Sequence, residues 1–183
     1  MQVDENMLIA RILDGRVRDY GYFLERYGNE VLALVSRIVP RQADAEDIVQ
    51  DVFVKAYDKL ATFNRQAGFS TWLFRIAYNA AISWTRKQKL SYVAIDERVV
   101  VDDAVVDDAL SADTEERIER LETAIEKLKP DEKMLITLFY FDDKRQSEIA
   151  YIMGIDEGNV SIKLHRIRKK LYLLMEGRIN ERR

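Results

Sequence analysis

Apolar residues recur at spacings of three and four along most of this chain, which is the pattern of helices that bury one side. Only two prolines and seven glycines interrupt its 183 residues, and 48% of the residues are hydrophobic. Long helices can therefore form, and there is enough apolar side-chain surface to pack cores between them. The pattern predicts an all-α fold. The clearest apolar stripe consists of Val160, Leu164, Ile167, Leu171 and Leu174.

An acidic segment interrupts these stripes and divides the chain. Residues 1–90 carry a net charge of +2, residues 91–116 carry −8, and residues 117–183 carry +3. The overall charge of −3 thus conceals two mildly basic ends, and the distribution of charge is what matters for nucleic-acid binding. We predict two small helical domains, 1–90 and 114–183, joined by an acidic linker over 91–113. Because valine favours strands, a short strand in "RVVVDDAVV" is the alternative to an extended linker.

Several classes of protein find no support in the sequence. There is no cysteine, which excludes disulfides and thiol-based sites. His165 is the only histidine and has no evident partner ligand, so no metal site is predicted. Motifs such as HExxH, GxSxG or a Walker-type loop do not occur, so we expect neither an enzyme nor a cofactor. Without a signal peptide or a long apolar run, the chain is expected to be cytoplasmic and not inserted in a membrane.

The segment "ADAEDIVQDVFVKAYDKL" predicts a helix with one buried side. Its apolar stripe consists of Ile48, Val52, Ala56 and Leu60. The polar residues that fall largely outside this stripe are Asp47, Gln50, Asp51 and Lys55. They form either a solvated face or a docking surface for a protein partner.

The next segment combines aromatic and basic residues. A loop over 63–69 should precede a helix that Ser70 or Thr71 caps and that runs to about Lys87. Rings that stack on bases, cations that hold phosphates and amides that read base edges are what single-stranded nucleic acid requires. The alternative is that these rings belong to the core. We expect Trp72 to be buried, and the loop and Asn79 to be exposed.

The stretch "SEIAYIMGIDEGNVSIKLHRIRKK" predicts two helices around a turn at Gly154, with Ser147 and Asp156 as caps. A helix-turn-helix places its second helix in the major groove of DNA. A two-helix corner is also a common packing unit, but the basic outward face favours DNA. The residues expected to point away from the core are Gly158, Ser161, Ile162, His165, Arg166 and Lys169.

Taken in order, three segments resemble the extracytoplasmic-function (ECF) sigma factors, small bacterial initiation factors of RNA polymerase. "DAEDIVQDVFVKAYDKLATF" resembles the polymerase-binding helix of the family, "FSTWLFRIAYNAAISWTRK" its −10 segment, and "SEIAYIMGIDEGNVSIKLHRIRKKL" its −35 helix-turn-helix. The resemblance implies a sigma-2-like helical bundle and a sigma-4-like helix-turn-helix domain. It also implies three partners: core RNA polymerase (through its clamp helices and flap), promoter DNA and an anti-sigma factor.

The resemblance assigns roles to residues at the matching positions. It implies polymerase contacts at Asp47, Gln50, Asp51, Phe53 and Lys55. It implies −10 DNA contacts at Phe63, Asn64, Arg65, Gln66, Phe69, Ser70, Asn79, Arg86 and Lys87, with Lys89 beside them. It implies −35 DNA contacts at Ser161, Ile162, Lys163, His165, Arg166 and Lys169.

Two other functions are compatible with a helix-turn-helix. One is a stand-alone transcriptional regulator whose residues 1–90 form a sensor or dimerisation domain. The aromatic–basic segment and the acidic linker argue against it, because a sensor needs neither. The other is a structural adaptor that binds polymerase without reading DNA.

Overall fold

The computed structural model describes residues 4–91 and 114–177, and every regular element within those ranges is helical. This confirms the all-α prediction, whereas the predicted acidic linker lies outside the described residues apart from Ser91. The elements of the amino-terminal half (residues 4–91) are α1 Glu5–Leu13, η1 Val17–Tyr20, α2 Gly21–Ser36, α3 Gln42–Asp58, η2 Leu60–Thr62 and α4 Phe69–Ser91. Those of the carboxy-terminal half (residues 114–177) are α5 Thr114–Glu126, α6 Pro130–Ile136, η3 Thr137–Phe141, α7 Gln146–Met153 and α8 Glu157–Met175.

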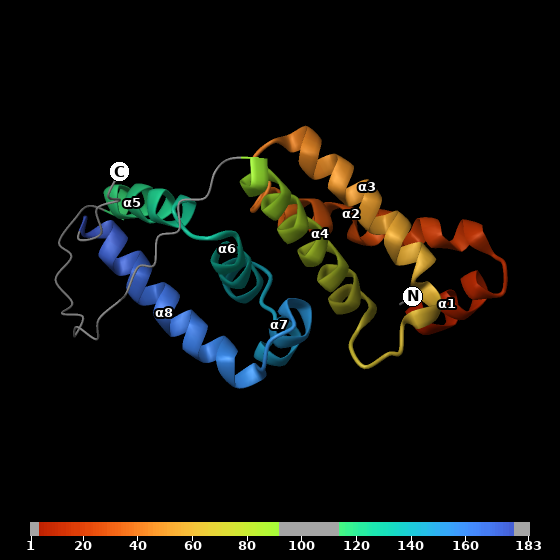
Figure 1. The fold of residues 1–183 in the computed structure, drawn as a ribbon. Coiled ribbons are helices and arrows are strands. Elements are labelled where there is room, and N and C mark those ends of the chain that lie inside the picture. The colour runs from red at the N-terminus through yellow and green to blue at the C-terminus, as the bar shows by residue number, and fades with distance from the viewer. Residues whose placement is uncertain (1–3, 92–113, 178–183) are drawn as a thin grey trace.

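Helices α2, α3 and α4 pack together in the amino-terminal half, and α1 lies at one end of them (Figure 1). Phe23, Val52 and Leu73 are fully buried where the three helices meet. The hydroxyl of Tyr20 donates a 2.7 Å hydrogen bond to the backbone oxygen of Phe53, which fixes η1 against α3. Burial raises the pKa of this hydroxyl, so it stays protonated and continues to donate.

An aromatic cluster anchors the start of α4. The Phe69 ring lies 4.0 Å from the Phe23 ring, centroid to centroid, and also contacts Phe63 and Trp72. Trp72 is buried, as predicted. The predicted cap at Ser70 or Thr71 is wrong, because the helix already begins at Phe69 and that ring is only 3% exposed. Exposing this ring to water would be unfavourable, so the helix begins where the ring packs into the aromatic cluster.

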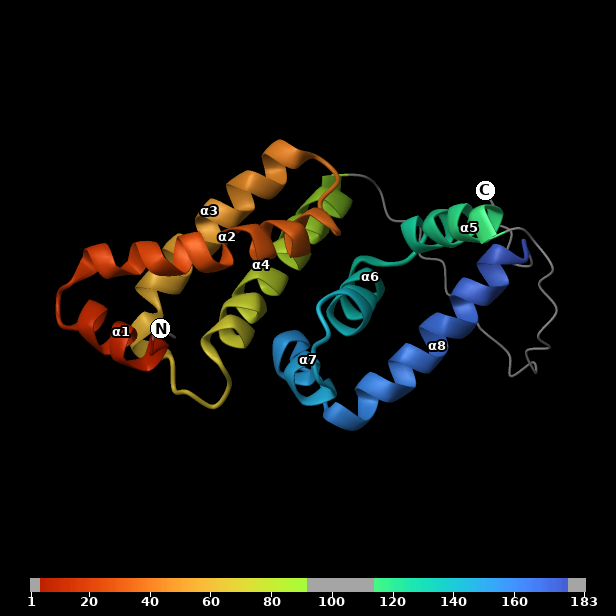
Figure 2. The same ribbon diagram turned by 180° about the vertical axis from the view of Figure 1, so that it is seen from behind.

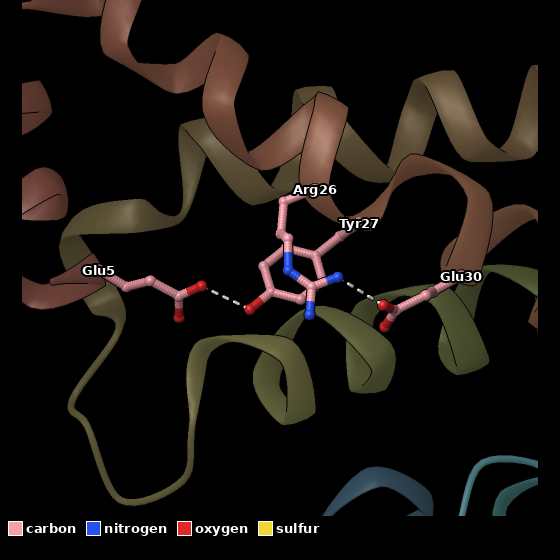
Figure 3. Close-up of polar contacts among 4 residues, drawn as sticks. All are labelled: Glu5, Arg26, Tyr27 and Glu30. Atoms are coloured by element: carbon pink, nitrogen blue, oxygen red, sulfur yellow. Dashed lines mark hydrogen bonds and ion pairs between the residues drawn. The ribbon is translucent and has the colours of Figure 1, made fainter. Parts of the chain in front are cut away.

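A hydrogen bond next to this cluster ties α1 to α2 (Figure 3). The hydroxyl of Tyr27 donates to Glu5 at 2.5 Å, and its ring packs on Phe69 with the centroids 5.9 Å apart. Arg26 pairs with Glu30 at 2.8 Å and holds its guanidinium 5.2 Å from the centre of the Tyr27 ring. Helix α1 therefore supports the α4 start through Tyr27.

The carboxy-terminal half contains the predicted corner of two helices. Gly154 ends α7 with φ +66°, a left-handed conformation that glycine adopts without strain, so the predicted turn is confirmed. Asp156 occupies the N-cap position of α8. The cap predicted at Ser147 is wrong, because α7 begins at Gln146 and Glu148 accepts the backbone N–H of Arg145 at 3.0 Å. The predicted stripe of α8 is buried, with Leu174 only partly covered.

The two halves pack against each other. Helix α4 lies beside α7 and α6 in both views (Figures 1 and 2). Helix α8 extends from the turn at Gly154 along the carboxy-terminal half (Figure 2) and is tied to α6 by the ion pair of Lys170 with Glu132 at 2.7 Å. Within residues 4–91 and 114–177, no helix has both the length and the apolar character needed to cross a membrane.

Candidate nucleic-acid interface

The outward face of α8 carries most of the residues predicted from the helical phase. Ser161, His165 and Arg166 are exposed, and Ile162 keeps half of its side chain in solvent. Lys163 and Lys169 are half-buried beside this face. An exposed isoleucine among polar and basic residues is suited to contact with a base edge or a thymine methyl group.

Some polar groups of α8 already have partners within the same half. The hydroxyl of Ser161 donates to the side-chain oxygen of Gln146 at 2.8 Å, which links the two helices of the corner. Arg168 donates to the hydroxyl of Tyr140 at 2.7 Å. Together with the Lys170–Glu132 ion pair, these bonds hold α8 in place, so its outward face is presented on a rigid support.

The loop before α4 presents three of its predicted residues to solvent. Asn64, Arg65 and Gln66 are exposed, and the Asn64 side chain accepts the backbone N–H of Gln66 at 3.2 Å. Arg65 has φ +60°, so the loop makes a sharp turn there. Phe63 is half-buried, and its ring lies 5.4 Å from the ring of Trp72.

Phe69 is an exception to the predicted exposure of this loop. Its ring is buried in the aromatic cluster and cannot stack on a base. Ser70 is half-buried. Residues 64–66 therefore form an exposed loop tip that can meet DNA. The buried Phe69 ring fixes the end of the loop that follows this tip.

A groove of about 370 Å³ between α3 and α4 gathers residues from two distant segments. Asn79 and Lys87 of α4 line it opposite Lys55 of α3 and Lys59, the residue that follows α3. The indole of Trp84 also lines it, and the Asn79 amide donates to the backbone oxygen of Arg75 at 2.8 Å. We call it the basic groove: with three ammonium groups against the single carboxylate of Asp51, an amide and a ring, it offers the groups that single-stranded nucleic acid needs.

Sequence reasoning did not assign Lys59 and Trp84 to this groove. Lys59 lies four residues after Lys55, which is one helical turn, so its proximity was visible in the spacing. Arg86 is exposed near the end of α4, whereas the side chain of Lys89 lies outside the described part of the chain.

A second groove of about 730 Å³ lies between η1, α2 and α3 and is strongly apolar. Val17, Leu24 and Val54 line it with 53%, 45% and 61% of their surface exposed. Phe53 and Tyr57 also line it. Exposed apolar side chains that form one continuous patch usually mark a binding site for another molecule.

The five predicted polymerase contacts do not lie together. Gln50 and Phe53 line the apolar groove, but Phe53 is 6% exposed and forms part of its floor. Asp51 and Lys55 line the basic groove on the other side of α3. Asp47 is exposed on α3 outside both sets of lining residues.

The two halves match two family models in the expected order. Residues 23–90 match sigma-70 region 2, and residues 118–171 match sigma-70 region 4. This pairing defines a sigma-70-type factor and does not favour a stand-alone regulator.

Relatives extend the match to nearly the whole chain. The chain is 32% identical to the ECF RNA polymerase sigma-E factor of Escherichia coli strain K12, over 93% of each chain. It is 30% identical to the ECF RNA polymerase sigma factor SigW of Bacillus subtilis strain 168, over 91% of this chain and 96% of that one. The chain belongs to the ECF family of RNA polymerase sigma factors. It therefore serves in transcription initiation, where sigma factors bind core polymerase and direct it to promoters.

Solved structures show the same fold. CnrH in complex with the cytosolic domain of CnrY is 25% identical, with a TM-score of 0.65 over 93% of this chain and 96% of that one. RpoE of Bartonella quintana in complex with the anti-sigma factor NepR is 25% identical, with a TM-score of 0.62 over 87% of this chain and 98% of that one.

Proposed function

We propose that three surfaces of this sigma factor divide the work of initiation. The outward face of α8 reads the −35 element, the loop tip and basic groove hold the −10 strand, and the apolar groove docks core polymerase. In this scheme residues 1–90 and 114–183 act as the −10 and −35 units. The observation that carries the proposal is the convergence of Asn79 and Lys87 with Lys55 and Lys59 on one groove.

The basic groove suits a melted strand better than a duplex. Its width is set by two packed helices, and its lining combines ammonium groups for phosphates with the Trp84 ring for stacking. The exposed loop tip at residues 64–66 adds amide and guanidinium groups that can read an unpaired base. We therefore propose Lys55 and Lys59 as phosphate contacts. For Lys55, this role replaces the polymerase contact that the resemblance implied.

The apolar groove suits a helical partner. Leu24 and Val54 project from two neighbouring helices with large exposed surfaces, and Gln50 supplies a polar group at the rim. An amphipathic helix that fills such a groove excludes water from its apolar lining. We assign this groove, with Asp47 beside it, to core RNA polymerase.

An anti-sigma factor is a further proposed partner. Both similar solved structures are complexes, one with the anti-sigma factor NepR and one with the cytosolic domain of CnrY. This chain has a similar fold over most of its length, which supports a partner of this type. The proposed place of action is the bacterial cytoplasm, where core polymerase and promoter DNA are found.

Transcription in vitro tests the proposal as a whole. Purified chain and core polymerase are incubated with fragmented genomic DNA, and the 5′ ends of the transcripts are sequenced. We expect a defined set of start sites that share two upstream elements. If core polymerase with this chain starts no more specifically than core polymerase alone, the proposed function is wrong.

The role of Arg166 is tested by changing it to alanine. A phosphate contact contributes about equally at every sequence, so we expect weaker holoenzyme binding across all −35 variants and a salt slope that is smaller by about one. The measurement is promoter binding at several salt concentrations. Ile162→Ala is the matched comparison, because loss of a base-facing side chain should change the preference among −35 sequences. A strongly sequence-selective loss for Arg166→Ala would count against its phosphate role.

A further inference from the structure

One side-chain hydrogen bond joins the two helices of the corner on the surface that we assign to −35 DNA. Gln146 is the first residue of α7, and Ser161 lies near the start of α8. The hydroxyl of Ser161 donates to Oε1 of Gln146 at 2.8 Å. Ser161 is exposed and Gln146 is half-buried beside it, so a base edge that meets α8 also meets this bond.

The direction of this bond decides what Ser161 can still do. An amide oxygen can only accept, whereas a serine hydroxyl has one hydrogen and two lone pairs. With its hydrogen given to Gln146, Oγ of Ser161 can only accept a further hydrogen bond. A serine without such a partner rotates its hydroxyl and can donate or accept, which is why serine by itself contacts several kinds of base edge.

The backbone around the corner holds the two side chains in register. At the start of α7, the N–H of Arg145 donates to the Glu148 side chain at 3.0 Å. In the turn that follows α7, the N–H of Ile155 donates to the backbone oxygen of Ala150 at 3.1 Å. Helices α7 and α8 also pack directly on each other. The Gln146 amide therefore starts from a fixed position next to α8.

The four bases differ in what they offer such an acceptor. In the major groove, adenine and cytosine each present an amino group that donates, at N6 and N4. Guanine and thymine present acceptor oxygens, and guanine adds the acceptor N7. Facing these acceptors, Ser161 gains a hydrogen bond only if its hydroxyl turns away from Gln146, and the existing bond is then lost.

We propose that Gln146 determines part of the −35 specificity by making Ser161 an obligate acceptor, so that the base facing Ser161 must carry an amino group in the major groove. Adenine and cytosine satisfy this requirement. The inference rests on the proposed function, because it assumes that the outward face of α8 reads the −35 element. Gln146 acts through Ser161 and is therefore a positioning residue, which needs no base contact of its own.

The first test identifies the base pair that Ser161 faces. Holoenzyme made from the full-length chain and core polymerase selects bound fragments from a promoter library randomised over the −35 element, and the fragments are sequenced. Ser161→Ala should remove the preference at one position. There the unchanged chain should favour adenine or cytosine over guanine and thymine about fivefold, the effect of one hydrogen bond. A preference for guanine or thymine there, or no change at any position, would overturn the proposal.

Two substitutions of Gln146 separate its hydrogen bond from its place in the fold. Gln146→Leu removes the acceptor and frees the Ser161 hydroxyl, so the preference at this one position should fall to within about twofold. Gln146→Glu keeps an acceptor for the hydroxyl and should keep the preference, although its charge weakens binding at every sequence. A merely structural role predicts the reverse for Gln146→Leu, with weaker binding overall and an unchanged preference. That result would disprove the inference.

A base analogue that lacks the amino group gives a second readout. Placed at the preferred position, it should weaken binding about fivefold for the unchanged chain and for Gln146→Glu, but within about twofold for Gln146→Leu. Equal losses in all three would show that the selection does not act through Gln146. Ile162→Ala is the control, because it should alter a different −35 position. If the unchanged chain shows no preference at any −35 position, the proposed reading by α8 itself is wrong, so the two failures are distinguishable.

Discussion

Replacing Val54 by aspartate is expected to weaken the binding of core RNA polymerase by about 100-fold, the effect of losing a central interface anchor. Val54 projects into the apolar groove with 61% of its surface exposed, so the free protein should fold normally. In the complex, the new carboxylate would be buried against apolar groups without a partner charge. Titration of labelled core polymerase with the variant measures the loss.

Met7→Asp is the matched control, because Met7 is also an exposed apolar residue, at 63%, and lies on α1 outside the groove. Its affinity should stay within about twofold of the unchanged protein, as expected of a surface substitution away from the interface. Equal losses for both variants would show that the groove is not the docking site. Helical content measured by circular dichroism separates unfolding from lost binding.

Replacing Phe69 by alanine is expected to lower the free energy of unfolding by about 3–5 kcal/mol, the usual cost of truncating a buried phenylalanine. The ring fills the centre of the aromatic cluster, 4.0 Å from Phe23 and 5.6 Å from Trp72. Its loss leaves a cavity between the start of α4 and α2. Chemical denaturation followed by circular dichroism measures the change.

The same truncation at Phe141, whose ring is 54% exposed, should cost about 1 kcal/mol or less. If Phe69→Ala lowered the free energy of unfolding as little as Phe141→Ala does, the ring would not anchor the structure. The direct contact of Phe69 with DNA that the resemblance implies would then be favoured again. A large loss of stability supports the view that Phe69 positions the loop tip at residues 64–66 from behind.

Local pattern was enough to predict the helices and the orientation of α8. Residues three and four apart must share a side of a helix, so the buried stripe of α8 also determined which residues point outward. Gly154 was recognisable because a left-handed turn favours glycine. Trp72 was correctly placed in the core because Ile76 and Ala80, which follow it at spacings of four, belong to the predicted core face.

What the pattern missed depends on neighbours that are distant in sequence. Phe69 was expected to be exposed because it lies at a loop end, yet Phe23 from another helix covers it. Asp51 and Lys55 were grouped with Gln50 by sequence, but one helix presents them to different grooves. The pairing of Thr71 with Glu148 joins residues 77 positions apart, and no local spacing predicts it.

Helix α4 has three sides with separate tasks: Leu73 and Ala77 face the core, Asn79 and Lys87 face the groove, and Thr71 and Arg75 face the other half. In genetic terms, substitutions along this one helix should sort into three phenotypes that alternate with the helical repeat. Changes on the first side should reduce protein abundance, and those on the second should reduce expression of the target genes. Changes on the third side should weaken the packing of α4 on α7, and a screen of this single mutagenised segment could recover all three classes.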